Sequence, residues 1–316
     1  MKHLISVIVL LAGSFQLAHA ASNRIFVTNE RSNDISVIDG SSLEIERTIE
    51  VGDRPRGIGI SPDGAELYIA VSEENVIAVI DLKTLELLRK FQAGSDPETF
   101  AVHPNGNIYI SNEDDAKASV YNPKTGEQLA EIQVGLEPEG VAISPDGKQV
   151  IVTSESTNML HVIQVPEHTI AANILVGARP RAATFTKDGT IAYSTSEISG
   201  EVKKVDMTNH EVIAVRKIAD EKAKPKDVIL NKDETKLYVA GGRANQVIVL
   251  NADTMDFIKG IPVGKRVWGL TMSKDGSKVF STNGVSGTVS VIDTGKDEVI
   301  KTIEVGKFPW GVVIDD

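Results

Sequence analysis

The sequence predicts an all-β protein folded as a seven-bladed propeller, and three observations predict this class. A Val-Gly pair, or a close variant of it, returns every 41 to 44 residues. Each period contains short runs of β-branched and aromatic residues, separated by turn signals about every ten residues. Four short strands in a repeat of about 40–45 residues are typical of propeller blades, and no 3.6-residue helical periodicity competes with them.

Within a repeat, the expected elements follow one order. A first strand leads into a turn such as SPDG (61–64), where proline presets φ and glycine tolerates a positive φ. A second strand such as LYIA (67–70) follows, then a variable polar loop, a third strand ending in a run such as VID (79–81), and a fourth strand that returns to Val-Gly. The most degenerate copy begins at Ala219-Asp220 and carries NKDE (231–234) at its turn, so the sixth blade is expected to depart most from the others.

The two ends of the chain are predicted to complete one blade together. Six whole repeats run from Asp53 to Gly306. The segment 23–51 begins with the second-strand motif IFVTN and supplies strands two to four, whereas 307–314 is a lone first strand. Pairing these ends closes the ring and removes open sheet edges.

Residues 1–20 are predicted to be a secretory signal peptide, and residues 21–316 the seven-bladed domain. The segment starts with Lys2, continues with an apolar run over 4–12, and ends with the small-x-small site Ala18-His19-Ala20. No later window reaches the roughly 18 apolar residues of a membrane span. The mature protein is therefore expected to be exported to the periplasm, without a membrane span.

Composition narrows the function classes further. The formal net charge of −11 disfavours binding to nucleic acid, because the chain repels phosphate backbones. The absence of cysteine excludes disulfides, thiolate metal sites and a cysteine nucleophile.

The best candidate site is the face that carries the Val-Gly entry segments, because the regular turns of the other face have a backbone explanation. The first strands should line a central channel, where ligands usually sit in ring-shaped folds. Residues just before the repeat's glycine position are Arg56, Glu98, Glu139, Arg181, Lys226, Trp268 and Trp310. Two positions earlier stand Arg54, Asp96, Glu137, Arg179, Lys224, Arg266 and Phe308.

These two sets of aligned residues predict a charged channel mouth with an aromatic wall. Such a mouth suits an anionic or aromatic ligand or a charged partner. The predicted binding residues are Arg54, Arg56, Glu98, Glu139, Arg181, Lys226, Arg266, Trp268 and Trp310. Two alternatives stay open at this point. In the first alternative, the charged residues bind no ligand because they pair across blades or are solvated. In the second, the tryptophans fill the channel as core packing.

No catalytic residues, metal site or cofactor are predicted. Four glutamates share one aligned position after the second strand, namely Glu30, Glu113, Glu155 and Glu197, but they belong to four different blades. The four histidines of the mature chain do not converge in the repeat frame, and no H-E-x-x-H or G-x-S-x-G motif occurs.

The motifs FVTN (26–29), SVID (36–39), SPDG (61–64) and VGxxPxG (51–57, 134–140, 305–311) resemble the YVTN family β-propeller repeat. More specific runs look like the proteins associated with pyrroloquinoline-quinone (PQQ)-dependent catabolism: SNEDD (111–115), TSESTNMLHVI (153–163), VGKRVWGL (263–270), STNGVSGTVSVID (281–293) and VGKFPWGV (305–312). The resemblance covers the whole mature chain. It implies a seven-bladed exported protein linked to PQQ-dependent alcohol oxidation, and it offers no catalytic residues to carry over.

The leading functional hypothesis is a non-catalytic periplasmic binding or scaffold protein for this catabolism. The expected partners are a periplasmic quinoprotein dehydrogenase, its cytochrome or an ABC transporter component. The alternative is an enzyme that uses the channel, such as a lactonase or an oxidoreductase subunit.

Overall fold

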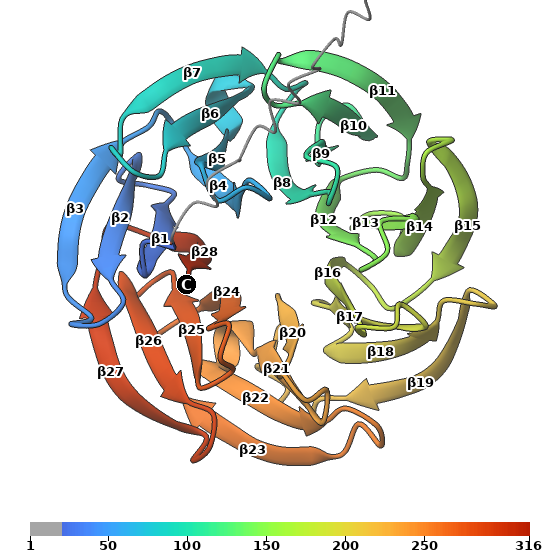
Figure 1. Cartoon of the computed structure of the whole chain (residues 1–316). Helices are drawn as coiled ribbons and strands as arrows, with labels where there is room; N and C mark the ends of the chain where they lie inside the picture. The colour runs from blue at the N-terminus through green and yellow to red at the C-terminus, as the bar shows by residue number, and fades with distance from the viewer. Residues whose placement is uncertain (1–20) are drawn as a thin grey trace, which may run out of the picture.

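Seven four-stranded antiparallel sheets stand in a ring around a central channel in the computed structural model, which describes residues 21–316 (Figure 1). The first strand of every sheet lies at the channel and the fourth at the rim. The predicted all-β seven-bladed propeller is thus confirmed. No described helix is long and apolar enough to cross a membrane. The predicted signal peptide lies outside the described residues, so that assignment stays a prediction.

The blades are numbered in chain order. The first blade combines β28 (Pro309–Asp315) with β1 (Arg24–Asn29), β2 (Asp34–Asp39) and β3 (Ile45–Glu50). The second blade holds β4 (Pro55–Ile60), β5 (Glu66–Val71), the 3₁₀ turn η1 (Ser72–Glu74), β6 (Val76–Asp81) and β7 (Leu87–Gln92). The third holds β8 (Pro97–Val102), β9 (Ile108–Asn112), β10 (Lys117–Asn122) and β11 (Glu127–Gln133). The fourth holds β12 (Pro138–Ile143), β13 (Gln149–Ser154), β14 (Met159–Gln164) and β15 (Thr169–Leu175).

The fifth blade holds β16 (Pro180–Phe185), β17 (Ile191–Ser196), β18 (Glu201–Asp206) and β19 (Glu211–Lys217). The sixth holds β20 (Val228–Leu230), β21 (Lys236–Ala240), η2 (Gly242–Ala244), β22 (Gln246–Asn251) and β23 (Phe257–Pro262). The seventh holds β24 (Val267–Met272), β25 (Lys278–Asn283), β26 (Thr288–Asp293) and β27 (Glu298–Glu304). The sixth blade is the irregular one, as expected, because β20 has only three residues.

The core lies between neighbouring blades rather than inside any one of them. Strands two and three of each blade are buried on both faces, so they carry continuous apolar runs such as LYIAV in β5. The cluster that includes Phe26, Leu67 and Ile80, for example, joins the first and second blades. Each blade therefore depends on its neighbours for burial, and the ring has to close to be stable.

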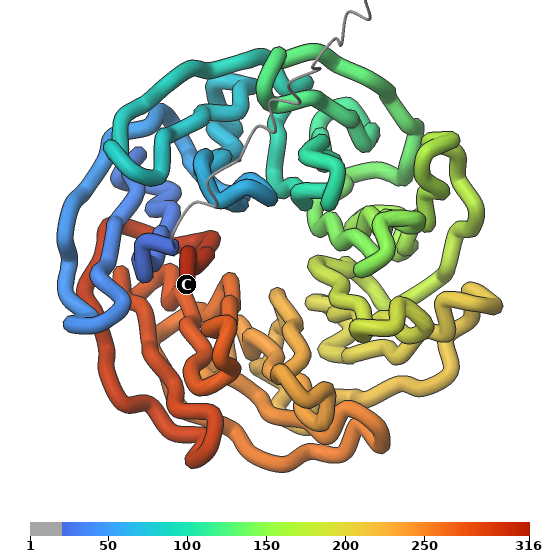
Figure 2. The backbone as a smooth tube through the Cα atoms, viewed as in Figure 1, coloured from blue at the N-terminus to red at the C-terminus, as the bar shows by residue number. Residues whose placement is uncertain are grey.

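Closure takes place in the first blade. Strand β1 pairs antiparallel with β28, in a register that sets Ile25 opposite Ile314 and Arg24 opposite Asp315. Figure 2 shows the C-terminal strand, in red, lying beside the N-terminal segment, in blue. The predicted joining of the chain ends is confirmed.

A hydroxyl group on the second strand ties each of five blades to the next. Thr282 Oγ1 accepts the N–H of Gly269 in its own blade and donates to the carbonyl of Trp310 on β28, both at 2.8 Å. Equivalent bonds are made by Thr28, Ser111, Thr153 and Thr195. Alanine stands at the corresponding positions of the second and sixth blades, Ala70 and Ala240.

In the four blades that have glycine at the repeat's glycine position, the neighbouring channel strand lies too close for an added Cβ. A Cβ added at Gly311 would lie 2.7 Å from the carbonyl oxygen of Arg56 and 2.9 Å from Ile58 Cγ2. A Cβ at the exposed turn residue Gly295 would meet only Asp293 Oδ1, at 3.4 Å.

We therefore expect Gly311→Ala to lower the free energy of unfolding by about 1–3 kcal/mol through overpacking, and Gly295→Ala to change it by less than about 0.5 kcal/mol. Guanidinium unfolding of both variants, followed by circular dichroism, measures the difference. Equal midpoints for the two variants would contradict the close approach of β28 and β4.

Candidate functional site

The channel mouth is built from the residues that precede each inner strand. In six of the seven blades the outer mouth residue has a left-handed backbone: Arg54, Asp96, Glu137, Arg179, Arg266 and Phe308, with φ between 43° and 60°. This conformation is unfavourable for residues with a Cβ and needs support. At four of the positions the residue's N–H donates to an asparagine of the preceding blade, as Asp96 does to Asn75 Oδ1 at 2.8 Å.

Between the first three blades, arginines and carboxylates form one ion-pair network. Arg54 contacts Asp96 at 3.1 Å and Glu98 at 3.3 Å. Arg56 contacts Glu30 at 2.9 Å and also pairs with Glu98, which is fully buried. Arg54, Arg56 and Glu98 lie together at the mouth and contact one another in this sector, and their role in binding stays a prediction.

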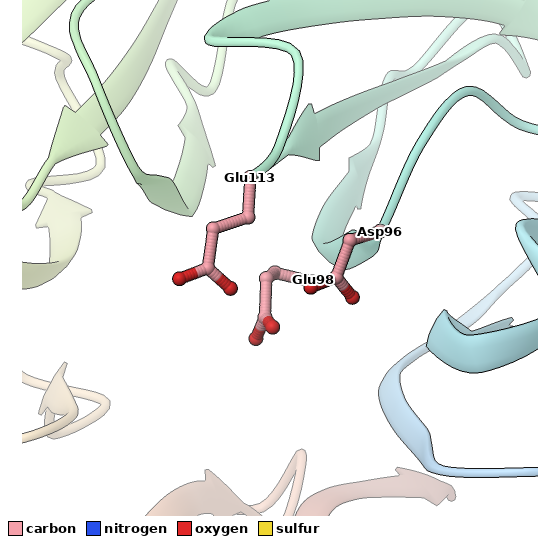
Figure 3. A group of neighbouring side chains, drawn as sticks. All are labelled: Asp96, Glu98 and Glu113. Atoms are coloured by element: carbon pink, nitrogen blue, oxygen red, sulfur yellow. The ribbon is translucent and has the colours of Figure 1, made fainter.

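Three carboxylates of the third blade, Asp96, Glu98 and Glu113, lie within 4.8 Å of one another (Figure 3). Burial and the nearby Glu139 carboxylate hold the pKa of Glu98 well above its usual range, and a hydrogen bond with Glu113 favours its protonated form. A divalent cation fits this group poorly, since the guanidinium groups of Arg54 and Arg56 already contact Asp96 and Glu98. This group draws its three carboxylates from one blade, whereas two of the aligned glutamates, Glu155 and Glu197, share the arginines Arg179 and Arg181.

Arg181 is the centre of a second network. It is 6% exposed, pairs with Glu139 at 2.5 Å and with Glu155, and lies 3.6 Å from Glu197. Arg179 adds contacts to Glu155 at 2.5 Å and to Glu197 at 3.5 Å. A single buried guanidinium thus compensates three carboxylates that burial would otherwise penalise strongly.

The two tryptophans of β24 and β28 form an aromatic wall of the channel between the two networks, which we call the tryptophan wall. Their rings are stacked, with centroids 6.1 Å apart and an interplanar angle of 28°. Trp268 carries three cations on its face: Lys226 at 4.1 Å, Arg266 at 5.0 Å and Arg181 at 5.3 Å from the ring centroid. The indole N–H of Trp310 is buried without a hydrogen-bond partner. A buried donor of this kind costs free energy unless a ligand or water accepts from it.

Two arginines beside this wall carry uncompensated charge, and we call them the cationic pair. Among the described residues no ion pair includes Arg243 or Arg266, although both line the mouth. Burial and the charge of Arg243 lower the pKa of Arg266, which shows that its environment disfavours the charged form. The mouth is therefore balanced where the two ion-pair networks lie and positive beside Trp268, where Arg266 stands.

Three connected spaces follow one another along the channel. The outer space at the mouth measures about 370 Å³ and shares Glu139, Arg181, Lys226 and Trp268 with the next. That next space, the inner cavity, measures about 150 Å³ and is lined by Thr99, Val141, Ala183, Asp227, Trp310 and the four shared residues, among others. A deeper space of about 190 Å³ begins beyond Trp310, Asp227 and Thr99.

Lys226 and Asp227 are the unusual ionisable residues of the inner cavity. Burial and the neighbouring Arg181 lower the pKa of Lys226 to about 7, against the opposing effect of Glu197 at 2.6 Å. Burial raises the pKa of Asp227 to about 6, although its oxygens accept the N–H groups of Val228 and Leu270, each at 2.8 Å.

Sequence reasoning missed Asp227. It stands at the repeat's glycine position, where the other blades have Gly57, Thr99, Gly140, Ala182, Gly269 and Gly311. An alignment of the repeats does mark Asp227, because it is the one acidic residue at a position where the other blades have small residues. Ala240 lacks the hydroxyl that bridges five of the blades, and in the sixth blade the carboxylate of Asp227 makes the link to β24.

All nine predicted binding residues reach the channel, in two groups. Arg54, Arg56, Glu98, Glu139 and Arg181 are largely tied up in ion pairs, as the pairing alternative anticipated. Lys226, Arg266, Trp268 and Trp310 face one another around the tryptophan wall.

Comparison with family models places the chain among known proteins. Residues 95–290 match the family described as the Choice-of-anchor I domain, which is more than half of the chain. Residues 10–156 match the description SMP-30/Gluconolactonase/LRE-like region. No curated protein matches the chain.

Several solved structures share the fold. A functionally unknown protein from Desulfotomaculum acetoxidans is 16% identical, with a TM-score of 0.81 over 93% of this chain and 99% of that one. Hydrazine synthase from Kuenenia stuttgartiensis is 20% identical, with a TM-score of 0.75 over 81% of this chain and 88% of the other. The dihydro-heme d1 dehydrogenase NirN, in complex with DHE, is 14% identical, with a TM-score of 0.72 over 96% and 77%. At these identities the similarity establishes the fold alone.

The two kinds of arginine should differ sharply in stability. Arg181→Met leaves buried carboxylates uncompensated, so we expect it to lower the free energy of unfolding by about 3–5 kcal/mol. Arg266→Met removes no ion pair, and we expect a change within about 1 kcal/mol. Chemical denaturation at pH 7 makes the comparison, and similar losses for the two variants would show that Arg181 does not stabilise its network.

Proposed function

We propose that this chain, which belongs to the Choice-of-anchor I domain family, is a non-catalytic binding protein that holds a small planar anion at the tryptophan end of its channel mouth. We further propose that the chain belongs with the YVTN-type propellers of PQQ-dependent alcohol catabolism, which its sequence motifs resemble. Within it, the protein works in the periplasm beside a quinoprotein dehydrogenase, its cytochrome or an ABC transporter component.

One observation carries the proposal: the cationic pair lies beside a stacked aromatic wall. Most mouth charges are cancelled by ion pairs, whereas Arg243 and Arg266 have none among the described residues. A carboxylate bound there would gain charge-assisted hydrogen bonds without having to break an existing pair. A flat ring attached to it would pack against Trp268, whose neighbouring cations favour an anionic ligand.

The proposed ligand class has a direct probe. Pyrroloquinoline quinone is a flat aromatic tricarboxylate, so it combines the two features that the mouth would recognise. Trp268 and Trp310 are the only tryptophans of the chain, and intrinsic tryptophan fluorescence therefore reports on this site alone.

We expect pyrroloquinoline quinone to bind with quenching of tryptophan fluorescence, and calorimetric affinity to fall as salt screens the arginines. Arg266→Met and Arg243→Met should each weaken binding by about tenfold, the loss of one charge-assisted contact. Arg216→Met, the same change at the rim on β19, serves as the control and should leave the affinity unchanged. Equal affinity in all three variants, or in a Trp268→Ala/Trp310→Ala double variant, would overturn the site.

An enzyme that uses the channel is the second candidate function, as a lactonase or an oxidoreductase subunit. The match of residues 10–156 to the SMP-30/Gluconolactonase description favours it. So does Glu113, which lies in the channel and, among the described residues, has no basic partner in an ion pair.

If this candidate is right, the purified protein will hydrolyse a simple lactone such as gluconolactone, or oxidise an alcohol when an artificial electron acceptor is supplied, in assays run with and without added calcium. Glu113→Gln should then abolish turnover while leaving the melting temperature nearly unchanged, because it breaks no ion pair. Glu155→Gln tests the neighbouring blade. Absence of turnover under every condition would remove this candidate and leave the binding proposal standing.

A further inference from the structure

Lys226 occupies the boundary between the outer space and the inner cavity. Lys226 is only 5% exposed, yet it lines both spaces. A molecule that enters from the mouth therefore passes its amine. The Nζ atom lies 4.1 Å from the Trp268 ring centroid and 2.6 Å from Glu197 Oε2. The aromatic face holds the amine on one side, and the carboxylate stands ready to exchange a proton on the other.

The charged groups around Lys226 leave it underpaired. Its carboxylate partner Glu197 is shared with Arg179 and Arg181, which lie 3.5 Å and 3.6 Å from it, and Arg181 also pairs with Glu139 at 2.5 Å. The pKa of Lys226 is lowered to about 7 by burial first and by Arg181 second. Much of the amine is therefore neutral at physiological pH, which is the form that acts as a nucleophile.

The inner cavity has the size and wall for a small ring. Its volume of about 150 Å³ equals that of an apolar protein cavity known to hold benzene. Trp268, Trp310, Val141 and Ala183 supply apolar walls. The buried indole N–H of Trp310, which lacks a partner, is the donor that a polar atom of such a guest would satisfy.

We propose that Lys226 captures a small aldehyde of about benzene size as a reversible imine inside this cavity. The Nζ lone pair attacks the carbonyl carbon, the C–N bond forms, and the carbonyl π electrons move to oxygen. Glu197 takes the protons that nitrogen releases and delivers them to that oxygen. The C–O bond then breaks, and one water leaves. The step consumes no oxidant or reductant, and hydrolysis reverses it.

This inference goes beyond the proposed function and does not rest on it. The planar anion of that proposal binds at the cationic pair in the outer space, whereas the imine forms deeper, at the amine. Arg266→Met should lose anion binding and keep aldehyde capture. The two proposals can therefore fail independently, and each failure can be measured separately.

The test is reductive trapping of benzaldehyde with cyanoborohydride on the full mature chain, followed by peptide mapping. At pH 7 a lysine of pKa about 7 has about a thousandfold more neutral amine than an ordinary lysine, partly offset by lower intrinsic nucleophilicity. We therefore expect Lys226 to be benzylated at least about tenfold faster than any other lysine. Its rate, measured at constant reductant, should reach half of its maximum near pH 7.

Two controls keep the outcome decisive. Lys236→Arg removes another lysine that is 2.6 Å from a carboxylate, that of Asp297, but lies outside the channel spaces, and fast labelling should persist. Lys226→Arg, by contrast, should abolish the fast labelling. In the wild-type protein, toluene, which has no carbonyl group, should slow labelling at Lys226 and not at Lys236. Labelling of Lys226 no faster than that of Lys236, or insensitivity to toluene, overturns the proposal.

Discussion

The structure depends on a hydroxyl bridge that joins neighbouring channel strands. In five blades a serine or threonine of the second strand accepts an N–H from its own inner strand and donates to the carbonyl of the next one. The bridge explains why the inner strands approach so closely, why small residues line the channel, and why closure by β28 matters. At Thr28 the same bond joins the two ends of the chain, because its partner Gly311 belongs to β28. Where the hydroxyl is missing in the sixth blade, Asp227 replaces it and leaves a buried carboxylate at the channel.

This constraint shapes the electrostatics of the mouth. Seven strands that converge on one axis bring the residues ahead of their glycine positions together, so charged residues there have to pair or remain costly. Arg56 and Arg181 offset most of the free-energy cost of burying these charges, because each of them pairs with two carboxylates. The exceptions are concentrated beside the tryptophan wall, where the cationic pair and the underpaired Lys226 gather. A protein selected for stability alone would not keep a buried lysine of lowered pKa, so this sector is the part of the ring most suited to binding.

Much of the fold was readable from the chain because its signals are local and repeated. The return of Val-Gly, the SPDG turns and the alternation of strand runs each specify one element, and seven copies remove the ambiguity of any single one. The site was predicted less completely. The nine mouth residues were found by aligning repeats, but their partners were not, since Arg56 and Glu30 are 26 residues apart and meet only across a blade boundary. Asp227 was overlooked because repeat alignment draws attention to what recurs.

The sequence by itself determined the blade count, the composite blade and the column of residues that faces the channel, because backbone periodicity and turn chemistry act over a few residues. It also placed Trp268 and Trp310 at equivalent positions on adjacent first strands. Only the tertiary structure decided which charges cancel. It brought Arg181 to three carboxylates, left Arg243 and Arg266 without any among the described residues, and stacked the two indoles at 6.1 Å. Those outcomes depend on distances between side chains of different blades, and these distances exist only once the ring has closed.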